Sequence, residues 1–337
     1  MNCEKQSPTK ETTKRINCKH YLNSSDGVST GLCVLTTEFC CVIDFKSQAP
    51  RLSHSSLSDW MDCKRKYWLR NIKGISIKNS AMSPAVKCGA LWDVCVGVLL
   101  GQEDKARIPE TIQSYEIEPR DVAKVKALYR AWKKLDLNID SFCKFQAEYV
   151  IPFKYRDTEI EFIVKGIMDR RYDDWFAETK LSSKPDWYLN LFNITPQVSI
   201  YFLLDPKMSY VSMEVTRLPD LKSTGTFSDE TDEAYEERCI KDILKRPAYY
   251  FSGYSKDTNS FGKKFYRAEF DLDATLNRLQ SVFFEIVQAA DLDNYYKNYR
   301  SCYSPFQCDY LNLCQYDVMS EEIYQIKPKG GNANDAV

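Results

Sequence analysis

Histidine is almost absent from this chain: His20 and His54 are the only two among 337 residues. Any metal or catalytic scheme that needs several histidine ligands is therefore excluded. No apolar run approaches the about 18 residues of a membrane-spanning helix, and the polar stretch Met1–Ser7 lacks the apolar core of a secretory signal. We expect a soluble cytoplasmic protein with no membrane partner.

The chain also lacks a strong charge of either sign, since its formal net charge is −1. Such a balance neither requires nor excludes a nucleic-acid partner, because a local basic patch can bind phosphates. Hydrophobic residues make up 44% of the sequence, enough for a sizeable core in one large domain or two small ones. The 13 cysteines, without an export signal, argue against a disulfide scaffold and favour metal binding wherever they cluster.

Two predicted strands, Phe162–Asp169 and Tyr172–Lys180, carry the residues around which the chain is organised. Side chains alternate along a strand, so Glu178 and Lys180 share one face. If Asp169 ends the neighbouring strand on that face, two carboxylates and an ammonium group converge. A hard divalent cation binds such a carboxylate pair, and the lysine can orient a water molecule or offset the charge of a phosphate.

A helix is predicted over Leu52–Ile72, where apolar and aromatic residues recur at helical spacing, and Ser55 or Ser56 can cap it. Its distal half mixes cations with aromatic side chains, a combination that suits the phosphate backbone of a nucleic acid. Arg65 and Lys66 are the candidate contacts. The alternative is a solvated basic face without a partner.

A second helix, predicted over Cys88–Gly101, is apolar apart from Asp93. A lone carboxylate on an apolar face is costly unless it is paired or binds a metal ion. Asp93 is therefore a candidate third metal ligand, and the alternative is an aspartate on the surface of the helix.

Further helices and strands follow from the spacing of apolar residues. Helices are predicted over Glu118–Leu135, Thr195–Leu204, Ser228–Lys245 and Ala274–Tyr296, and strands over Phe145–Tyr155, Ser209–Leu218 and Lys264–Phe270. In the helix over Thr195–Leu204, Gln197 and Tyr201 are four residues apart and therefore share a face.

Cysteines gather toward both ends of the chain. Residues 1–50 form a predicted small Cys-rich module, in which a zinc ion or an iron–sulfur cluster could be held by Cys18, Cys33, Cys40 or Cys41, together with His20 or Cys3. Their spacing matches no standard zinc finger, and unligated thiols in an irregular arm are the alternative.

Near the C-terminus, Cys302, Cys308 and Cys314 recur at a regular spacing that indicates a loop binding a metal ion or a cluster. Such a site needs a fourth thiolate, for which Cys63 in the first predicted helix is the candidate, and coincidental core cysteines are the alternative. The predicted division of the chain is the module 1–50, a core 51–300, a cysteine clasp 301–316 and a flexible tail 317–337.

Taken together, these stretches resemble the PD-(D/E)xK nuclease superfamily, in particular its RecB-like branch, which includes CRISPR-associated adaptation nucleases and many bacteriophage exonucleases. The resemblance covers roughly Leu52 to Cys314. The family's motifs match at Gly166-Ile167-Met168-Asp169 for the metal-binding aspartate, at Glu178 and Lys180 for (D/E)-x-K, at Gln197 and Tyr201 for Q-x-x-x-Y, and at Ser53–Tyr67 for the start of the first helix.

The resemblance implies a restriction-endonuclease-like core, which is an α/β fold with a central mixed β-sheet flanked by helices. It implies catalysis by Asp169, Glu178 and Lys180, with Mg²⁺ or Mn²⁺ held by Asp93, Asp169, Glu178 and the carbonyl group of Thr179. It further implies DNA contacts from Gln197, Tyr201, Arg65 and Lys66, and a [4Fe-4S] cluster on Cys63, Cys302, Cys308 and Cys314.

Two features depart from the family pattern. The commoner C-terminal spacing of the family is C-x-x-C-x(5)-C, whereas this chain has C-x(5)-C-x(5)-C, as do some phage sequences. The family's G-x-x-x-H motif reads Gly89 and Asp93 here, and an aspartate can still bind the metal ion directly.

The function that the resemblance implies is a metal-dependent DNA nuclease, in particular an exonuclease that hydrolyses phosphodiester bonds from DNA ends, single- or double-stranded. Recombination, repair or phage DNA processing in a bacterial or phage-infected cell would be its setting, with a processing protein as a partner. Two alternatives stay open. One is a retired nuclease fold that binds DNA or other proteins, which the aspartate at 93 permits. The other is an iron–sulfur sensor in which the cluster is the working part.

Overall fold

The computed structural model describes residues 51–138, 142–156, 161–191, 195–304 and 307–326. The predicted Cys-rich module 1–50, with Cys3, Cys18, His20, Cys33, Cys40 and Cys41, lies outside the described residues. The last part of the predicted flexible tail, 327–337, lies outside them as well.

A mixed β-sheet forms the centre of the molecule, as predicted. Its strands are β1 (Arg51–Leu52), β3 (Lys144–Lys154), β4 (Glu161–Arg171), β5 (Trp175–Ser182), β6 (Tyr210–Arg217) and β7 (Lys263–Tyr266). The order is β1-β4-β5-β6-β7, and β3 pairs with β4. The pairs β1–β4 and β5–β6 are parallel, and the other three are antiparallel.

The strand β4 has three partners, and this arrangement opens the sheet at one place. β3 pairs along β4 from Glu161 to Arg171 and so occupies one whole edge of it. β1 and β5 therefore share the other edge, β1 beside Ile163 and Val164, and β5 only beside Arg170 and Arg171. Beyond these last two pairs β5 leaves β4, and we call the region bordered by β1, β4 and β5 the β4–β5 opening.

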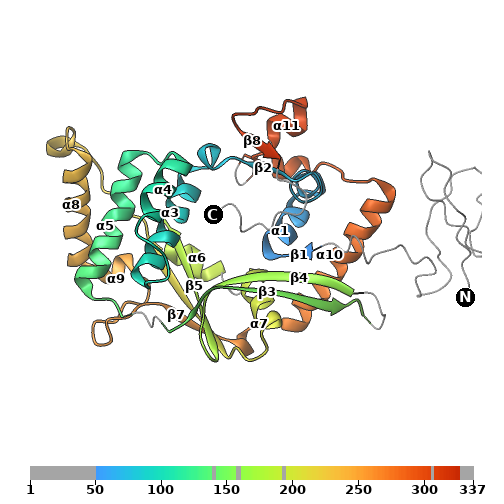
Figure 1. Ribbon diagram of the computed structural model, residues 1–337, viewed down its shortest axis with the longest axis horizontal. Helices are drawn as coiled ribbons and strands as arrows, with labels where there is room; N and C mark the ends of the chain where they lie inside the picture. Colours follow the sequence, from blue (N-terminus) through green and yellow to red (C-terminus); the bar gives the residue numbers. More distant parts are fainter. Residues whose placement is uncertain (1–50, 139–141, 157–160, 192–194, 305–306, 327–337) are drawn as a thin grey trace, which may run out of the picture.

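Helices flank the sheet (Figure 1). They are α1 (His54–Asp62), α2 (Lys64–Tyr67), α3 (Pro84–Leu99), α4 (Arg107–Tyr115), α5 (Pro119–Leu135), α6 (Pro185–Leu191), α7 (Pro196–Leu204), α8 (Asp232–Lys245), α9 (Pro247–Tyr250), α10 (Leu272–Leu292) and α11 (Leu311–Tyr316). In Figure 1, α3, α4, α5 and α8 gather at the left end of the sheet, and α10 stands at its right end. The α/β class with a central mixed sheet is therefore confirmed.

Three apolar clusters hold these layers together. The largest joins β4, β5 and β6 to α1, α7 and α10, for example through Phe176, Phe202 and Phe283. A second joins α3, α5, α8 and α9, with Trp132 packed edge-on against Phe251. A third, small cluster joins a π-helical turn (Trp68–Ile72) to α11 and to β8 (Tyr324–Ile326).

The predicted single helix over Leu52–Ile72 is wrong in one respect, because the chain breaks at Cys63. This residue is extended (φ −165°, ψ 119°) and separates α1 from α2. Ser53, not Ser55 or Ser56, is the N-cap, since its Oγ accepts a hydrogen bond from the Ser56 backbone N–H at 3.2 Å. The break matters for the site described below, because the Cys63 thiol at this break contacts the backbone of Asn298.

Other predicted elements hold within a few residues, and several short ones were not predicted. The unpredicted elements include α4, α6, α9, α11, β1, β8 and β2 (Ile75–Ile77). β8 lies in the segment predicted as a flexible tail, but it pairs antiparallel with β2 and buries Tyr324. In the described part of the chain, no helix combines the length and the apolarity that crossing a membrane requires.

Candidate functional site

The strand β5 presents Glu178 and Lys180 on one face, as the alternation of a strand requires. Glu178 is fully buried, and its Oε1 accepts an ion-paired hydrogen bond from Lys180 Nζ. Gln197 on α7 donates a second hydrogen bond to the same oxygen at 2.6 Å, and also bonds the hydroxyl of Tyr201 at 2.9 Å. The Q-x-x-x-Y pair thus lies directly behind Glu178 and fixes its orientation.

DNA contacts from Gln197 and Tyr201 remain predictions. In the structure, both side chains make contacts inside the protein. Tyr201 is buried and packs its ring edge-on against Phe176 of β5. A hydrogen-bonded chain therefore runs from Tyr201 through Gln197 to Glu178. We call Gln197 and Tyr201 positioning residues, because they act on the site through Glu178.

Asp169 lies across the β4–β5 opening from these residues. The backbone N–H of Thr179 donates to Asp169 Oδ2 at 2.8 Å, which ties the end of β4 to β5 where the strands diverge. The Thr179 hydroxyl accepts a hydrogen bond from Arg170 Nη2 at 3.2 Å. Both contacts hold the three predicted residues Asp169, Glu178 and Lys180 within one short stretch of sheet.

Asp93 reaches the same place from α3, although it is far away in the sequence. Its side chain keeps contact with solvent, yet the surrounding protein and the charge of Asp169 raise its pKa to about 8, with Lys180 opposing and Glu178 adding to the rise. Helix α3 packs on β5, which explains the proximity. The structure thus brings the three predicted carboxylates together.

The charges of the group are strongly interdependent. Burial and the nearby Asp169 raise the pKa of Glu178 to about 7, although Lys180 and Gln197 oppose this. Burial disfavours the charge of Lys180, but Glu178 and Asp169 more than offset it and hold its pKa well above the ordinary value. Glu178 Oε2 is buried and has no hydrogen-bond partner among the described residues. Three carboxyl groups thus share the charge of one lysine, and two of them keep their protons to unusually high pH.

Two further side chains lie at this group, and neither was assigned to it from the sequence. Burial raises the pKa of Tyr188 on α6, which is near enough to feel the charges of Lys180, Glu178 and Asp169. Burial and the charge of Lys180 lower the pKa of His54, the first residue of α1. The sequence carried no signal for either: His54 falls inside the predicted helix Leu52–Ile72, and α6, which carries Tyr188, was not predicted.

The second group consists of the four predicted cluster ligands, which come from both ends of the described chain. Cys63 Sγ accepts a hydrogen bond from the Asn298 backbone N–H at 3.3 Å, and Cys308 N–H donates to the Cys302 carbonyl at 2.9 Å. Burial raises the pKa of Cys308 and that of Cys314, and the nearby thiol of Cys63 adds to both shifts. The structure thus brings these four cysteines together.

The predicted cationic contacts lie beside the cysteines rather than beside the carboxylates. Lys66 forms ion pairs with Asp59 at 3.1 Å and with Asp62 at 3.3 Å. The guanidinium of Arg65 stacks over the Trp68 ring, 4.0 Å from its centroid. Both cations are thus engaged by side chains of the fold and do not form the freely solvated basic face of the alternative, and their contact with DNA stays a prediction.

Neither group is a closed metal site. Throughout the ranges that the structure describes, no three or more His, Cys, Asp and Glu side chains are arranged so that they could hold a metal ion. The carboxylates and the cysteines are neighbours within their groups, and binding an ion or a cluster would require them to close in.

Comparisons with known proteins do not assign a family. No family model matches the chain. No curated protein matches it either. One similar solved structure is described as "Crystal structure of SSO0001"; it is 14% identical over 50% of this chain and 77% of that chain, with a TM-score of 0.22. A likeness this slight carries over neither fold nor function.

Proposed function

We propose that this chain is a metal-dependent deoxyribonuclease with a restriction-endonuclease-like core, and that it acts as an exonuclease on DNA ends in the cytoplasm. The support is the convergence of Asp93, Asp169, Glu178 and Lys180 in the β4–β5 opening. The order of motifs along the chain and the mixed sheet agree with the resemblance to PD-(D/E)xK nucleases.

One observation carries the proposal: Glu178 Oε2 is buried without a hydrogen-bond partner among the described residues and lies beside two more carboxylates. An unpaired buried carboxylate oxygen is costly. A divalent cation would remove that cost and the repulsion among the three acids. Carboxylate oxygens are the donors that Mg²⁺ and Mn²⁺ prefer, so the donor set fits these ions.

The protein side of the mechanism follows from the contacts. Asp93, Asp169 and Glu178 would hold the ion, which would supply polarisation of the scissile phosphate and a water molecule of lowered pKa. Lys180 keeps its proton and offsets the charge that develops on the phosphate. Gln197 and Lys180 both hold Oε1 of Glu178, which leaves Oε2 as the oxygen for the ion. The Thr179 N–H fixes Asp169 in the same way.

The four cysteines fit an iron–sulfur cluster by the chemistry of their soft thiolate donors. Cys63 lies at the break between α1 and α2, and the other three follow α10. We assign such a cluster a structural role, because it would tie the start of the described chain to its end.

The test uses anaerobically purified protein with end-labelled linear and circular DNA, in Mg²⁺, Mn²⁺ or EDTA. Loss of linear DNA only, dependent on the metal and abolished by Lys180→Ala, is expected. Cleavage that continues in EDTA or in Lys180→Ala would contradict this active site.

A retired nuclease is the second candidate, and Asp93 is the observation that favours it. The family pattern has histidine there, and an additional acid increases the negative charge around Glu178. In this case the protein would bind DNA without cleaving it in any metal. Asp93→His would then be the substitution expected to restore cleavage.

A further inference from the structure

A cavity of about 460 Å³ lies next to the carboxylate group, between α3, α4 and the segment that leads from β2. Its size falls in the range of about 300–1,000 Å³ typical of pockets that hold small ligands. One wall comes from Lys78 and Asn79, another from Arg107 and Tyr115, and Gln325 of β8 closes a third side. The cavity is therefore lined by α3 and α4 on one side and by β8, which follows the C-terminal cysteines, on the other.

The position of Asp93 connects this cavity to the carboxylates. Ala90 and Val94 of α3 line the cavity, and they flank Asp93, one turn before it and one residue after it. On the opposite wall, burial and the nearby charge of Asp93 raise the pKa of Tyr115. The cavity therefore begins where the carboxylate group ends.

The lining has the chemistry of a nucleotide site. Lys78 and Arg107 supply positive charge, and the ion pairs of Arg107 with Glu103 and Glu110 are long, at 3.7 and 3.5 Å, which leaves guanidinium donors for an anion. Asn79 bonds Ser114 at 3.1 Å and offers amide and hydroxyl groups for a base or sugar. Glu110 lines the cavity too and would accept a hydrogen bond from a base.

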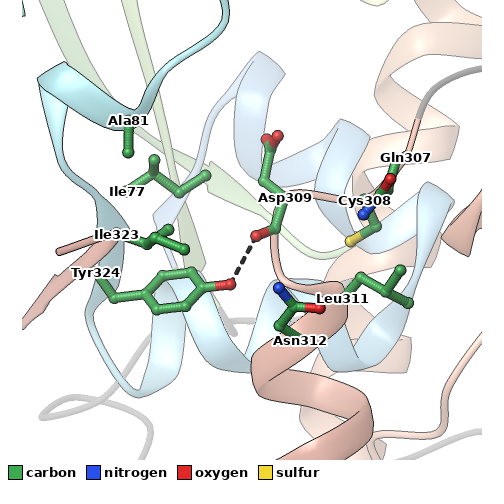
Figure 2. Close-up of a pocket in the computed structure, with 9 residues that line it drawn as sticks. All are labelled: Ile77, Ala81, Gln307, Cys308, Asp309, Leu311, Asn312, Ile323 and Tyr324. Carbon is green, nitrogen blue, oxygen red and sulfur yellow. Dashed lines mark hydrogen bonds between the residues drawn. The ribbon is translucent and has the colours of Figure 1, made fainter. Parts of the chain in front are cut away.

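A second cavity, of about 230 Å³, lacks these properties (Figure 2). Its lining of Ile77, Leu311, Ile323 and other residues contains no lysine or arginine among the described residues. Figure 2 shows the Tyr324 hydroxyl bonded to the Asp309 carbonyl oxygen across it, at 2.8 Å. Because its one charged residue is an aspartate, it does not suit a phosphate.

We propose that the larger cavity binds one phosphate-bearing nucleotide of the nucleic-acid strand, adjacent to the bond that is cut. Lys78 and Arg107 contact the phosphate, and the wall of Ala90, Val94 and Tyr115 contacts the base. The position of this site next to the cut bond rests on the proposed nuclease function. As a binding site it can be tested without turnover.

The test compares two double variants that remove the same charge. Lys78→Ala with Arg107→Ala changes the cavity, whereas Lys241→Ala with Arg278→Ala changes exposed cations on α8 and α10. Binding of a short fluorescent single-stranded oligodeoxynucleotide is measured by anisotropy in EDTA, over a range of salt concentrations. Cleavage of the same oligonucleotide is then measured with Mn²⁺. Melting temperatures establish that each variant is folded.

We expect the cavity variant to bind about tenfold more weakly and to lower the salt slope by about 2, one unit for each cation removed from the phosphate. Its KM should rise by a similar factor, with kcat changed less than about threefold. Ser114→Trp, which narrows the cavity and keeps both cations, should also weaken binding. The remote double variant should behave as the wild type does.

The outcomes separate this inference from the proposed function. If the wild type cleaves DNA and the cavity variant binds and cleaves like the remote control, the cavity site is overturned and the nuclease stands. If the wild type cleaves nothing, the nuclease proposal fails, and the binding measured in EDTA still decides the cavity. Weaker binding by the cavity variant then supports a nucleic-acid site, and unchanged binding overturns it.

Discussion

The carboxylate group around Glu178 and the cysteine group around Cys63 are assembled in different ways. The first stands on regular elements: two sheet strands, α3 and α7. The second stands on a break between short helices and on loops near the other end of the chain. In the first group hydrogen bonds orient Asp169, Glu178 and Lys180, whereas backbone contacts such as Asn298 N–H to Cys63 Sγ hold the second.

Because the two groups are assembled differently, a bound ligand would have a different role in each. The carboxylates keep their places through the sheet, so an ion would serve mainly to neutralise their charge. The cysteines are joined by few contacts, so a cluster would serve mainly to hold two distant segments together, as metal binding does in small metal-stabilised folds. Substitutions in the cysteine group should therefore affect folding, and those in the carboxylate group should affect activity.

The largest effect is expected for Cys308→Ala. A cross-link from Cys63 to the C-terminal cysteines closes a loop of about 240 residues, and such a link stabilises a fold by up to about 5 kcal/mol. We expect loss of the brown cluster absorbance and of iron, and a melting temperature lowered by about 10 °C. Cys143→Ala, outside both groups, is the matched control.

Full solubility, unchanged melting and retained colour in Cys308→Ala would disprove the structural cluster. Loss of colour with unchanged melting would retain a cluster but remove its structural role. The expectation that substitutions in the cysteine group affect folding would then be wrong.

Lys180→Ala should have the next largest effect, on rate and not on folding. Removing the group that offsets the charge of the phosphate should lower kcat by about 10³-fold, the cost of losing one such donor. Lys184→Ala, an exposed lysine four residues further on, should retain the wild-type rate. The rates come from single-turnover cleavage with Mn²⁺, and equal rates for the two variants would remove Lys180 from the site.

Gly166→Ala tests whether the carboxylate group depends on α7. A Cβ at Gly166 would stand 2.5 Å from Leu204 Cδ1 and 3.1 Å from the Tyr201 ring, so the Leu204 side chain must move and the ring that Gln197 bonds must give way. Overpacking of this kind costs about 1–3 kcal/mol, and activity should fall with the displacement of Glu178.

Gly89→Ala is the control for that substitution. A Cβ there meets nothing within 4 Å, and alanine favours a helix interior by up to about 1 kcal/mol. Urea unfolding should therefore show opposite signs for the two variants. If both variants unfold at the same urea concentration as the wild type, close packing of α7 against β4 does not explain the glycine at position 166.

The two groups also differ in how far the sequence predicts them. The Glu-x-Lys spacing fixes one face of a strand by geometry alone, so Glu178 and Lys180 were predictable together. Asp93 was predictable as the one acid of an apolar helix; the structure leaves its side chain exposed and adds its neighbours. Tyr188 and the internal role of Tyr201 were not predictable, because they depend on how α6 and α7 pack on the sheet.

The cysteine group shows which features local sequence patterns cannot predict. Regular spacing indicated that Cys302, Cys308 and Cys314 belong together, and helical spacing placed Cys63 on a continuous helix. The break at Cys63 is set by tertiary contacts with Asn298 and Tyr296, which no local propensity encodes. Short elements such as β2 and β8 were missed for the same reason, since each exists only through its partner.

The smallest expected effect is a pH dependence of the metal-free protein. The pKa of Asp93 is raised to about 8 and that of Glu178 to about 7, whereas carboxyl groups of an unfolded chain titrate near about 4. Between these values the folded protein binds protons that the unfolded chain has lost, so stability falls as the pH rises from about 4 to about 8. Below about pH 4 both states are protonated, and this contribution to stability is fully present.

Melting in EDTA across that pH range measures the effect, and Mn²⁺ should raise the melting temperature more at pH 8 than at pH 6, because ligands must lose their protons. Asp93→Asn should flatten the pH profile and reduce the rise with Mn²⁺, whereas Asp257→Asn, on an exposed loop, should leave both unchanged. A profile for Asp93→Asn that superimposes on that of the wild type would mean that Asp93 does not share charge with the carboxylate group.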